Sequence, residues 1–389
     1  MFELLFLLLP IAAGYGWYMG NRSAQNRRQE QSHHISRQYV EGLNLLLSDQ
    51  SDKAVDVFID LLQVDSETID THLALGNLFR SRGEVDRAIR IHQNLIARPN
   101  LTIDQRNLAL QQLGADYLVA GFYDRAEKIF EQLLDEPDHR VHALKQLLDI
   151  FQRTREWERA IEAATQLVKS GKQKLKRDIG QFYCELAMQA MAMEDNEKAR
   201  GYLKKAIGAD KQCVRATLMQ ARLLLSEERF KPAVKVLEGV LDQDVEFVSE
   251  AIPLLSQAYK GLGDEMGLMR FLKAAVDAKA GATTELKLAE FIAREQGGET
   301  AQTFLTRQLV KNPTMKGFYR LMDYHLEEAE EGRAKESLSS LRGLVGEQLK
   351  LKPNYRCHKC GFTAKSLYWQ CPSCKQWASV KPIRGLDGE

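Results

Sequence analysis

The sequence is poor in residues that interrupt helices and carries almost no net charge. Only 9 of its 389 residues are proline, so few helices need to break. Its 54 Lys and Arg side chains nearly balance 53 Asp and Glu, which leaves a net charge of +1. This balance excludes a global electrostatic attraction to nucleic acid or to an anionic membrane. Cysteine is also scarce: four of the six lie after residue 356, which argues against a disulfide framework spread through a secreted fold.

Motifs of the common enzyme classes are missing as well. The sequence contains no G-x-x-x-x-G-K-[ST] phosphate loop, no G-x-S-x-G nucleophile elbow and no H-E-x-x-H zinc-protease helix. Carboxylates are abundant, but they follow the helix periodicity described below and are typical of solvated helix surfaces. We therefore expect a protein that binds other proteins and is not an enzyme, with no nucleic-acid partner.

A long apolar run opens the chain. Residues 2–19 contain a single charged side chain, Glu3, and end in Trp17 and Tyr18. Their length lies at the short end of the ~17–25 residues that span a bilayer as a helix. Basic residues follow from Arg22 onward and none precedes the run, which places the bulk of the chain in the cytoplasm. The sequence thus predicts a transmembrane anchor over residues 1–20 and a linker over residues 21–34.

A cleaved signal peptide is the alternative to a membrane anchor, and the two glycines at the end of the segment have two interpretations of their own. A cleaved signal peptide would need a basic n-region, which this segment lacks. The Gly16-x-x-x-Gly20 spacing matches a helix-pairing pattern and would allow a homodimer, although it also fits a flexible glycine at a helix end.

Self-comparison reveals a repeat through the middle of the chain. An acid, a base and an alanine recur in that order, with the alanines 34 to 39 residues apart. A small residue usually lies twelve positions before each alanine, as at Gly76 and Gly114. A larger side chain often lies four positions after the alanine. We expect this side chain to fill the space between successive hairpins. Two antiparallel helices that cross closely need small residues where their axes approach. The alanines are Ala54, Ala88, Ala126, Ala160 and Ala199, with a degenerate copy at Ala233.

This pattern resembles the tetratricopeptide repeat, a helix–turn–helix unit of about 34 residues. The aromatic position of the first helix is filled by Phe79, Tyr117 and Phe151. Weaker copies extend the array with anchors at Leu268, Ala301 and Ala334, giving about nine repeats over residues 35–345. The predicted fold class is therefore an all-α tetratricopeptide-repeat superhelix with an N-terminal transmembrane helix and a small C-terminal metal domain.

Stacked helical hairpins form an extended binding surface that the first helix of each repeat usually lines. Polar side chains on these first helices are the candidate partner-binding residues, although each of them also fits a solvated helix face. They are Asn77, Arg80, Gln111, Lys145, Asp149, Gln152, Arg215 and Arg222. Cys184 and Cys213 lie inside repeats, where free cysteine commonly packs as a small apolar side chain.

The C-terminal region carries a strong metal-binding signal. Cys357 and Cys360 form one C-x-x-C pair, and Cys371 and Cys374 form a second one ten residues further on. Each pair can present two thiolates, and two facing pairs complete a tetrahedron around one iron or zinc ion. Two disulfides are the alternative, but they require an oxidising compartment, which conflicts with the predicted cytoplasmic orientation. We expect a structural metal domain over residues 346–389.

This domain resembles the rubredoxin-type and zinc-ribbon metal domains. Rubredoxins carry glycine after each C-x-x-C turn; Gly361 matches this pattern and Lys375 departs from it. The short gap between the two pairs also differs from electron-transfer rubredoxins. An electron-transfer function therefore remains only a minor alternative.

Taken together, the anchor, the repeats and the tetracysteine domain resemble the lipopolysaccharide assembly B family of enteric Gram-negative bacteria, over the whole chain. The resemblance implies a single-pass inner-membrane protein that faces the cytoplasm. It further implies an adaptor that helps a membrane-bound AAA+ protease degrade the deacetylase committing precursor to lipid A, and so limits lipopolysaccharide synthesis. The alternative is a scaffold for inner-membrane envelope-synthesis enzymes that involves no proteolysis.

Overall fold

The computed structural model describes residues 69–99 and 101–389, together with Trp17, Met19 and a few positions between 40 and 57. Apart from Trp17 and Met19, the predicted anchor and linker lie outside the described residues. Within the described part of the chain, no helix is both long enough and apolar enough to span a membrane. The chain divides into two compact units, residues 1–150 and residues 151–389.

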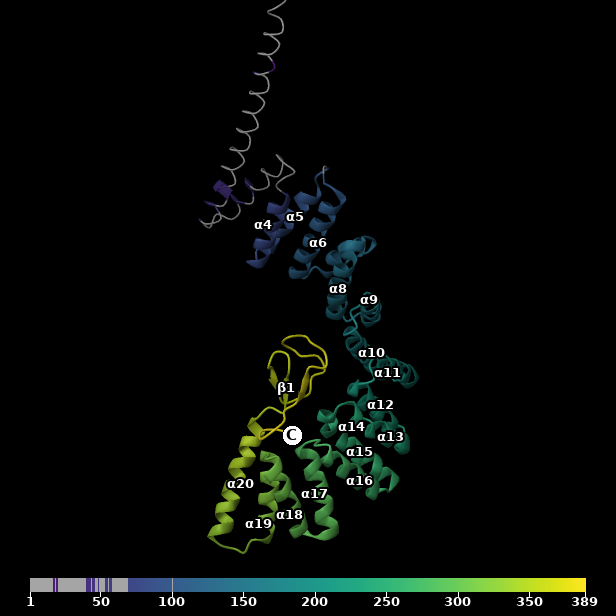
Figure 1. Cartoon of the computed structure of the whole chain (residues 1–389), viewed down its shortest axis with the longest axis vertical. Helices are drawn as coiled ribbons and strands as arrows, with labels where there is room; N and C mark the ends of the chain where they lie inside the picture. Colours follow the sequence, from purple (N-terminus) through teal and green to yellow (C-terminus); the bar gives the residue numbers. More distant parts are fainter. Residues whose placement is uncertain are drawn as a thin grey trace, which may run out of the picture. The chain divides into compact units, whose positions relative to one another are not determined.

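The described part of the first unit is built from antiparallel helix pairs (Figure 1). Helix α6 starts at a capping box, in which Thr102 and Gln105 each satisfy the other's backbone N–H. The elements are α4 (Ile69–Ser81), α5 (Val85–Ile96), α6 (Ile103–Val119), α7 (Tyr123–Gln132), η2 (Leu133–Asp135) and α8 (Pro137–Thr154), the last of which crosses into the second unit.

The second unit continues the helical hairpins and ends in a small sheet. Its first helices are α9 (Trp157–Lys169), α10 (Leu175–Ala192), α11 (Asn196–Ala209), α12 (Val214–Ser226), α13 (Phe230–Glu238) and α14 (Val240–Gln243). The chain then forms η3 (Val245–Phe247), α15 (Val248–Leu262), α16 (Glu265–Asp277), α17 (Ala282–Gln296), α18 (Gly298–Lys311), α19 (Met315–Glu328) and α20 (Arg333–Leu351).

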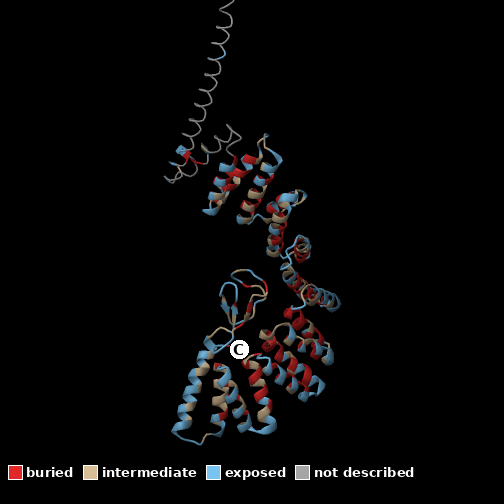
Figure 2. Ribbon diagram, viewed as in Figure 1, coloured by how far each residue is buried: buried red, intermediate tan, exposed pale blue. Residues whose placement is uncertain are grey.

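The repeat anchors predicted from the sequence lie where helices cross. All six anchor alanines from Ala54 to Ala233 are fully buried, and so is Ala301. Ala334 is the exception: it is exposed, because α20 has no buried residue at all (Figure 2). Helix α20 therefore pairs with α19, as the repeat predicts, but its anchor position is not buried.

Phe130, four residues after the anchor Ala126, packs within its own hairpin as well as against the next helix. A Cβ at Gly114 would lie 2.7 Å from the Phe130 ring, so the glycine makes room for that ring within its own hairpin. Phe130 also lies 6.3 Å from the ring of His142 on α8, the next helix in sequence. The sequence predicted only packing between successive hairpins, and the contact with the glycine adds to it.

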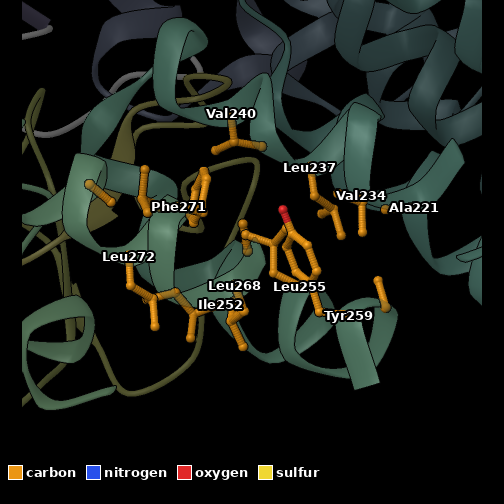
Figure 3. Packing of buried hydrophobic residues seen from close by; sticks show 14 of the residues in the cluster. Ala221, Val234, Leu237, Val240, Ile252, Leu255, Tyr259, Leu268, Phe271 and Leu272 are labelled. Carbon is orange, nitrogen blue, oxygen red and sulfur yellow. The ribbon is translucent and has the colours of Figure 1, made fainter. Parts of the chain in front are cut away.

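The largest described cluster of buried apolar residues lies in the second unit, across helices α12 to α17. In Figure 3 Leu237, Leu255 and Leu268 converge from three different helices of this region. Such hairpins bury their apolar faces only by stacking on their neighbours, so this core is shared between repeats.

The C-terminal sheet has three short antiparallel strands in the order β2-β1-β3. They are β1 (Tyr355–Cys357), β2 (Thr363–Ala364) and β3 (Val380–Pro382). Helix α20 continues to Leu351, so only three residues separate the helix from the first strand. We call residues 355–389 the ribbon.

Candidate functional site: the tetracysteine centre and its docking surface

The two C-x-x-C pairs form turns with the same hydrogen bonds. In the first turn the Gly361 N–H donates to the Cys357 carbonyl at 2.9 Å, and in the second the Lys375 N–H donates to the Cys371 carbonyl at 2.9 Å. The backbone N–H groups of Cys357 and Cys371 each donate to the carbonyl oxygen five residues further on, at 2.7 and 3.0 Å. Both turns need a residue with left-handed backbone after the second cysteine, which explains glycine at 361.

Lys375 adopts the same left-handed conformation without being glycine. Its φ is 57°, compared with 79° for Gly361. A side chain with a Cβ is strained in this region by roughly 1–2 kcal/mol. The departure from the rubredoxin pattern at Lys375 therefore leaves the turn intact and costs some stability.

The four cysteine sulfurs converge on one point. Cys357 and Cys374 Sγ lie 3.8 Å apart, and Cys360 and Cys371 Sγ lie 3.6 Å apart. All four sulfurs lie within 4.8 Å of one another. A tetrahedral ion with metal–sulfur bonds of about 2.3 Å needs sulfurs about 3.8 Å apart, so these residues fit a four-thiolate metal site. Disulfides, with sulfurs about 2.05 Å apart, do not match these distances.

The environment of Cys357 favours its thiolate. Burial raises the pKa of this thiol, but hydrogen bonds with Ser379 and with the N–H groups of Cys360 and Lys359 outweigh that effect and lower the pKa to about 6. Apolar side chains of Phe362, Leu367 and Val380 pack around the cysteines. Deprotonated sulfur inside a small apolar shell is the arrangement that a structural metal requires.

The ribbon is not an isolated domain, because its tryptophans insert into the helices of the second unit. The Trp377 Nε1–H donates to Gln152 Oε1 on α8 at 2.9 Å. Its ring lies edge-on to Trp157 and Phe182, with both centroids 5.9 Å away. Trp369 stacks on Phe247 with centroids 5.5 Å apart. We call the residues of the helical repeats that contact the ribbon, beginning with Gln152, Trp157, Phe182 and Phe247, the docking surface.

Arg215 connects the two tryptophans to the helices. Its guanidinium carbon lies 5.8 Å from the Trp377 ring and 6.0 Å from the Trp369 ring, within the range of cation–π attraction. The same guanidinium donates to Glu185 at 2.7 Å. Arg215 is buried, where an unpaired charge would be strongly destabilising. The Glu185 carboxylate and the two aromatic faces compensate this charge.

Polar contacts continue along the edge of the ribbon. Lys381 Nζ lies 2.7 Å from Asp244 and 2.6 Å from Glu246. Burial lowers the pKa of Lys381, but the hydrogen bonds and charges of these two carboxylates together outweigh it and raise the pKa above its usual value. The Tyr355 hydroxyl donates to Glu250 at 2.6 Å. Strand residues of the ribbon are thus tied to η3 and α15.

The last residues of the chain fasten the ribbon at its other end. Glu389 accepts hydrogen bonds from the Thr283 N–H at 2.9 Å and from its hydroxyl at 2.7 Å, and pairs with Lys316 Nζ at 2.6 Å. The Met315 N–H donates to the Leu386 carbonyl at 2.8 Å. Except for Trp157 on α9, Asp244 before η3 and the residues of η3, the side chains of the docking surface belong to first helices of their pairs, from α8 to α19.

The partner-binding candidates fall into three groups. Gln152 and Arg215 contact the ribbon. In the first unit, Arg80 donates to Asn77 at 2.7 Å and to Asp116 at 2.8 Å, and Gln111 accepts from His139 at 3.0 Å. Of the remaining candidates, Lys145 and Arg222 are exposed, and Asp149 is half-buried.

The sequence did not predict the docking surface. Trp369 and Trp377 lie close to the cysteine motif and could fill an apolar shell of the ribbon itself, but both contact helical residues of the second unit. One signal was available: two large aromatics are more than a three-stranded sheet of this size can bury by itself. The acidic partners of Lys381 carried no such signal, because they look like ordinary surface charge.

Matches to families of known proteins agree with this arrangement. The rubredoxin metal binding domain family matches residues 355–382. Tetratricopeptide repeat families match residues 71–102, and residues 112–174 and 184–245. The chain is thus a tetratricopeptide-repeat protein that carries a metal-binding ribbon at its C-terminal end.

Full-length relatives are more specific. The chain is 56% identical over 388 residues to lipopolysaccharide assembly protein B of Escherichia coli strain K12, covering 100% of both chains. It is 45% identical over 392 residues to the protein of the same name from Haemophilus influenzae, covering 98% of each. A tetratricopeptide repeat protein from Parabacteroides merdae has a solved structure that covers 72% of this chain and all of its own, at 13% identity and a TM-score of 0.32. The chain belongs to the lipopolysaccharide assembly protein B family.

Proposed function

We propose that this chain is an adaptor of the bacterial inner membrane that limits lipopolysaccharide synthesis. In this proposal residues 1–20 tether it to the membrane with the repeats in the cytoplasm. The array presents the deacetylase of the lipid A pathway to a membrane-bound AAA+ protease. The relatives' name, lipopolysaccharide assembly protein B, supports a role at the cell envelope.

One observation carries the proposal: the ribbon lies across first helices of successive repeats, where partner binding was expected. A partner must therefore meet a composite of ribbon and helices, or displace the ribbon. Either way the metal centre belongs to the binding surface, since a ribbon without metal cannot hold its tryptophans in place. A tether raises the local concentration of membrane-bound partners, so weak contacts suffice.

The metal in this proposal is one iron or zinc ion bound by Cys357, Cys360, Cys371 and Cys374. Because the protein supplies all four ligands, the ion would be structural. Metal analysis of the purified chain, together with a search for a reversible redox couple, decides between an iron and a zinc protein. A zinc occupant would exclude the electron-transfer alternative.

The decisive experiment deletes the gene and measures the turnover of envelope-synthesis enzymes. We expect the deacetylase to become long-lived, and we expect the wild-type chain to restore its decay. Cys371→Ser should fail to restore it, whereas Ser373→Ala, in the same turn but not at a ligand position, should succeed. If no enzyme lifetime changes while enzyme complexes are lost, the chain is a non-proteolytic scaffold instead.

The tether is tested separately. A chain lacking residues 1–20 should fold and yet fail to restore turnover. Fusing an unrelated membrane helix to that chain should recover part of the activity if the segment serves only as a tether. Full activity of the truncated soluble chain would contradict the tethered adaptor.

A further inference from the structure

A second pair of cysteines lies beneath the docking surface. Cys184 sits in the middle of α10, and Cys213 is the residue just before α12. Their sulfurs are 3.8 Å apart and both side chains are buried. Among the described residues this pair is not part of a larger group of metal ligands. Two neighbouring thiols without further ligands point to sulfur–sulfur chemistry.

The two thiols have different surroundings. The hydrogen bond from the Cys184 thiol lowers the pKa of Cys213 against the effect of burial, and the backbone N–H of Ala216 contributes in the same direction. The same hydrogen bond and burial raise the pKa of Cys184. Gln181 Nε2 also donates to Cys213 Sγ, at 3.4 Å. Cys213 is therefore placed to act as the attacking thiolate and Cys184 as the thiol that resolves the reaction.

We propose that Cys184 and Cys213 form a reversible disulfide when hydrogen peroxide oxidises the protein, and that this disulfide loosens the ribbon from its docking surface. The Cys213 thiolate attacks the peroxide oxygen and becomes a sulfenic acid, with one water released. The Cys184 thiol then attacks that sulfur and displaces the second water. The pair loses two electrons and two protons, and the peroxide is reduced to water.

Bond formation requires movement, and the structure shows which side can move. A disulfide holds its sulfurs about 2.05 Å apart, well short of the present 3.8 Å. Cys184 is fixed inside an 18-residue helix. Cys213 belongs to the short connection between α11 and α12, next to exposed Lys211 and Gln212. Opening of this connection both admits a small peroxide and allows Cys213 to approach Cys184.

The movement reaches the ribbon through two shared side chains. Gln181, which donates to Cys213, also lies 3.5 Å from Arg215, and its neighbour Phe182 packs against Trp377. Arg215 follows Cys213 by two residues and faces both ribbon tryptophans. The disulfide replaces the Cys213 thiolate, which accepts from Gln181, by a neutral and weaker acceptor. Drawing Cys213 toward Cys184 also shifts the start of α12, which carries Arg215. Ribbon docking is thereby weakened.

The test uses the full-length chain in detergent, loaded with zinc and treated with hydrogen peroxide. Peptide mapping without reductant locates disulfides, zinc analysis reports the ribbon thiols, and hydrogen exchange measures protection of residues 369–381. We expect a Cys184–Cys213 disulfide while zinc is still bound. Exchange in the ribbon should become about tenfold faster, as expected for losing the cation–π attraction between Arg215 and the ribbon tryptophans, and should return on reduction.

Two variants serve as controls. Cys213→Ser retains an acceptor for Gln181, and Cys184→Ala keeps a small apolar side chain at the buried position. Neither variant should respond to peroxide in the ribbon. The proposal is overturned if zinc is released before any Cys184–Cys213 bond forms. It is also overturned if that bond forms without faster exchange, or if both variants respond as the wild type does.

Discussion

Lys375 has a left-handed backbone at a position where rubredoxins carry glycine. Lys375→Gly removes a Cβ from a position with φ 57° and should stabilise the ribbon by about 1 kcal/mol. Chelator titration of the zinc-loaded chain, followed by circular dichroism or tryptophan fluorescence, measures the gain. Lys359→Gly is the matched control: it has no left-handed strain to relieve and should be neutral or destabilising. Equal effects of the two substitutions would show that the backbone at 375 is unstrained.

Asp178, in the first turn of α10, is half-buried where its ionised form is disfavoured. Burial raises its carboxyl pKa from 3.8 to about 6, although Arg177 acts in the opposite direction. Because the folded state holds the proton more tightly, this carboxyl favours folding below pH 3.8, and that contribution is lost as the pH rises through 6. Its charge at pH 8 then costs about 2–3 kcal/mol of folding free energy.

Asp178→Asn should therefore stabilise the protein at pH 8 and have little effect at pH 4. Denaturant unfolding of both proteins across this range measures the difference, which should grow by about 2 kcal/mol with rising pH. A difference that stays constant with pH would mean that Asp178 titrates as it does in the unfolded chain.

Among the elements, the hairpins depend on close helix crossing at particular glycines. Gly114→Ala places a Cβ 2.7 Å from the Phe130 ring and should destabilise the fold by about 1–3 kcal/mol through overpacking. Gly201, in α11, is the control because a Cβ there meets nothing within 4 Å. Gly201→Ala should stabilise by roughly 0.5–1 kcal/mol, since alanine is the better helix former. Thermal unfolding of the two variants with the same sign would contradict the repeat geometry.

These elements also show what the sequence could and could not predict. The anchor alanines were found because the repeat is local: each lies a fixed number of residues from its partner on the adjacent helix. Ala334 follows the same spacing and is exposed, since burial depends on a following layer that spacing alone does not report. The metal ligands were found because C-x-x-C is a short motif. The contact between Gln152 and Trp377 spans 225 residues, and no local pattern encodes it.

Trp377 docks the ribbon through both aromatic and polar contacts. Trp377→Ala removes an edge-on aromatic contact with Trp157 and Phe182 and the hydrogen bond to Gln152, a loss of about 3–5 kcal/mol. We expect the ribbon to keep its metal but to separate from the helices, so that a protease cuts between residues 351 and 355. Tyr368→Ala, which alters an exposed aromatic of the same ribbon, should not expose this site. Unchanged protection in Trp377→Ala would place the docking energy elsewhere.

At the scale of the whole chain, the described contacts make metal binding a condition for the shape of the binding surface. The ribbon has strands of two or three residues and a core formed largely by its own cysteines, so removal of the ion should unfold it. The helices have separate cores and should remain helical. Hydrogen exchange should then rise in the ribbon, and at the starts of α12, α15 and α17 that it covers.

Lys381→Glu separates the loss of ribbon docking from the loss of the metal. It leaves the four cysteines untouched but places a carboxylate beside Asp244 and Glu246, so the repulsion should release the ribbon from η3 while the metal stays bound. Exchange should increase on the helices and remain slow in the ribbon core, and the charge-restoring partner change Glu246→Lys should recover part of the protection. Hydrogen exchange on the helix faces could instead stay slow both in the metal-free chain and in Lys381→Glu. The repeats would then keep the shape of their binding surface without the ribbon. The requirement for the metal would then have to come from a partner that contacts the ribbon directly.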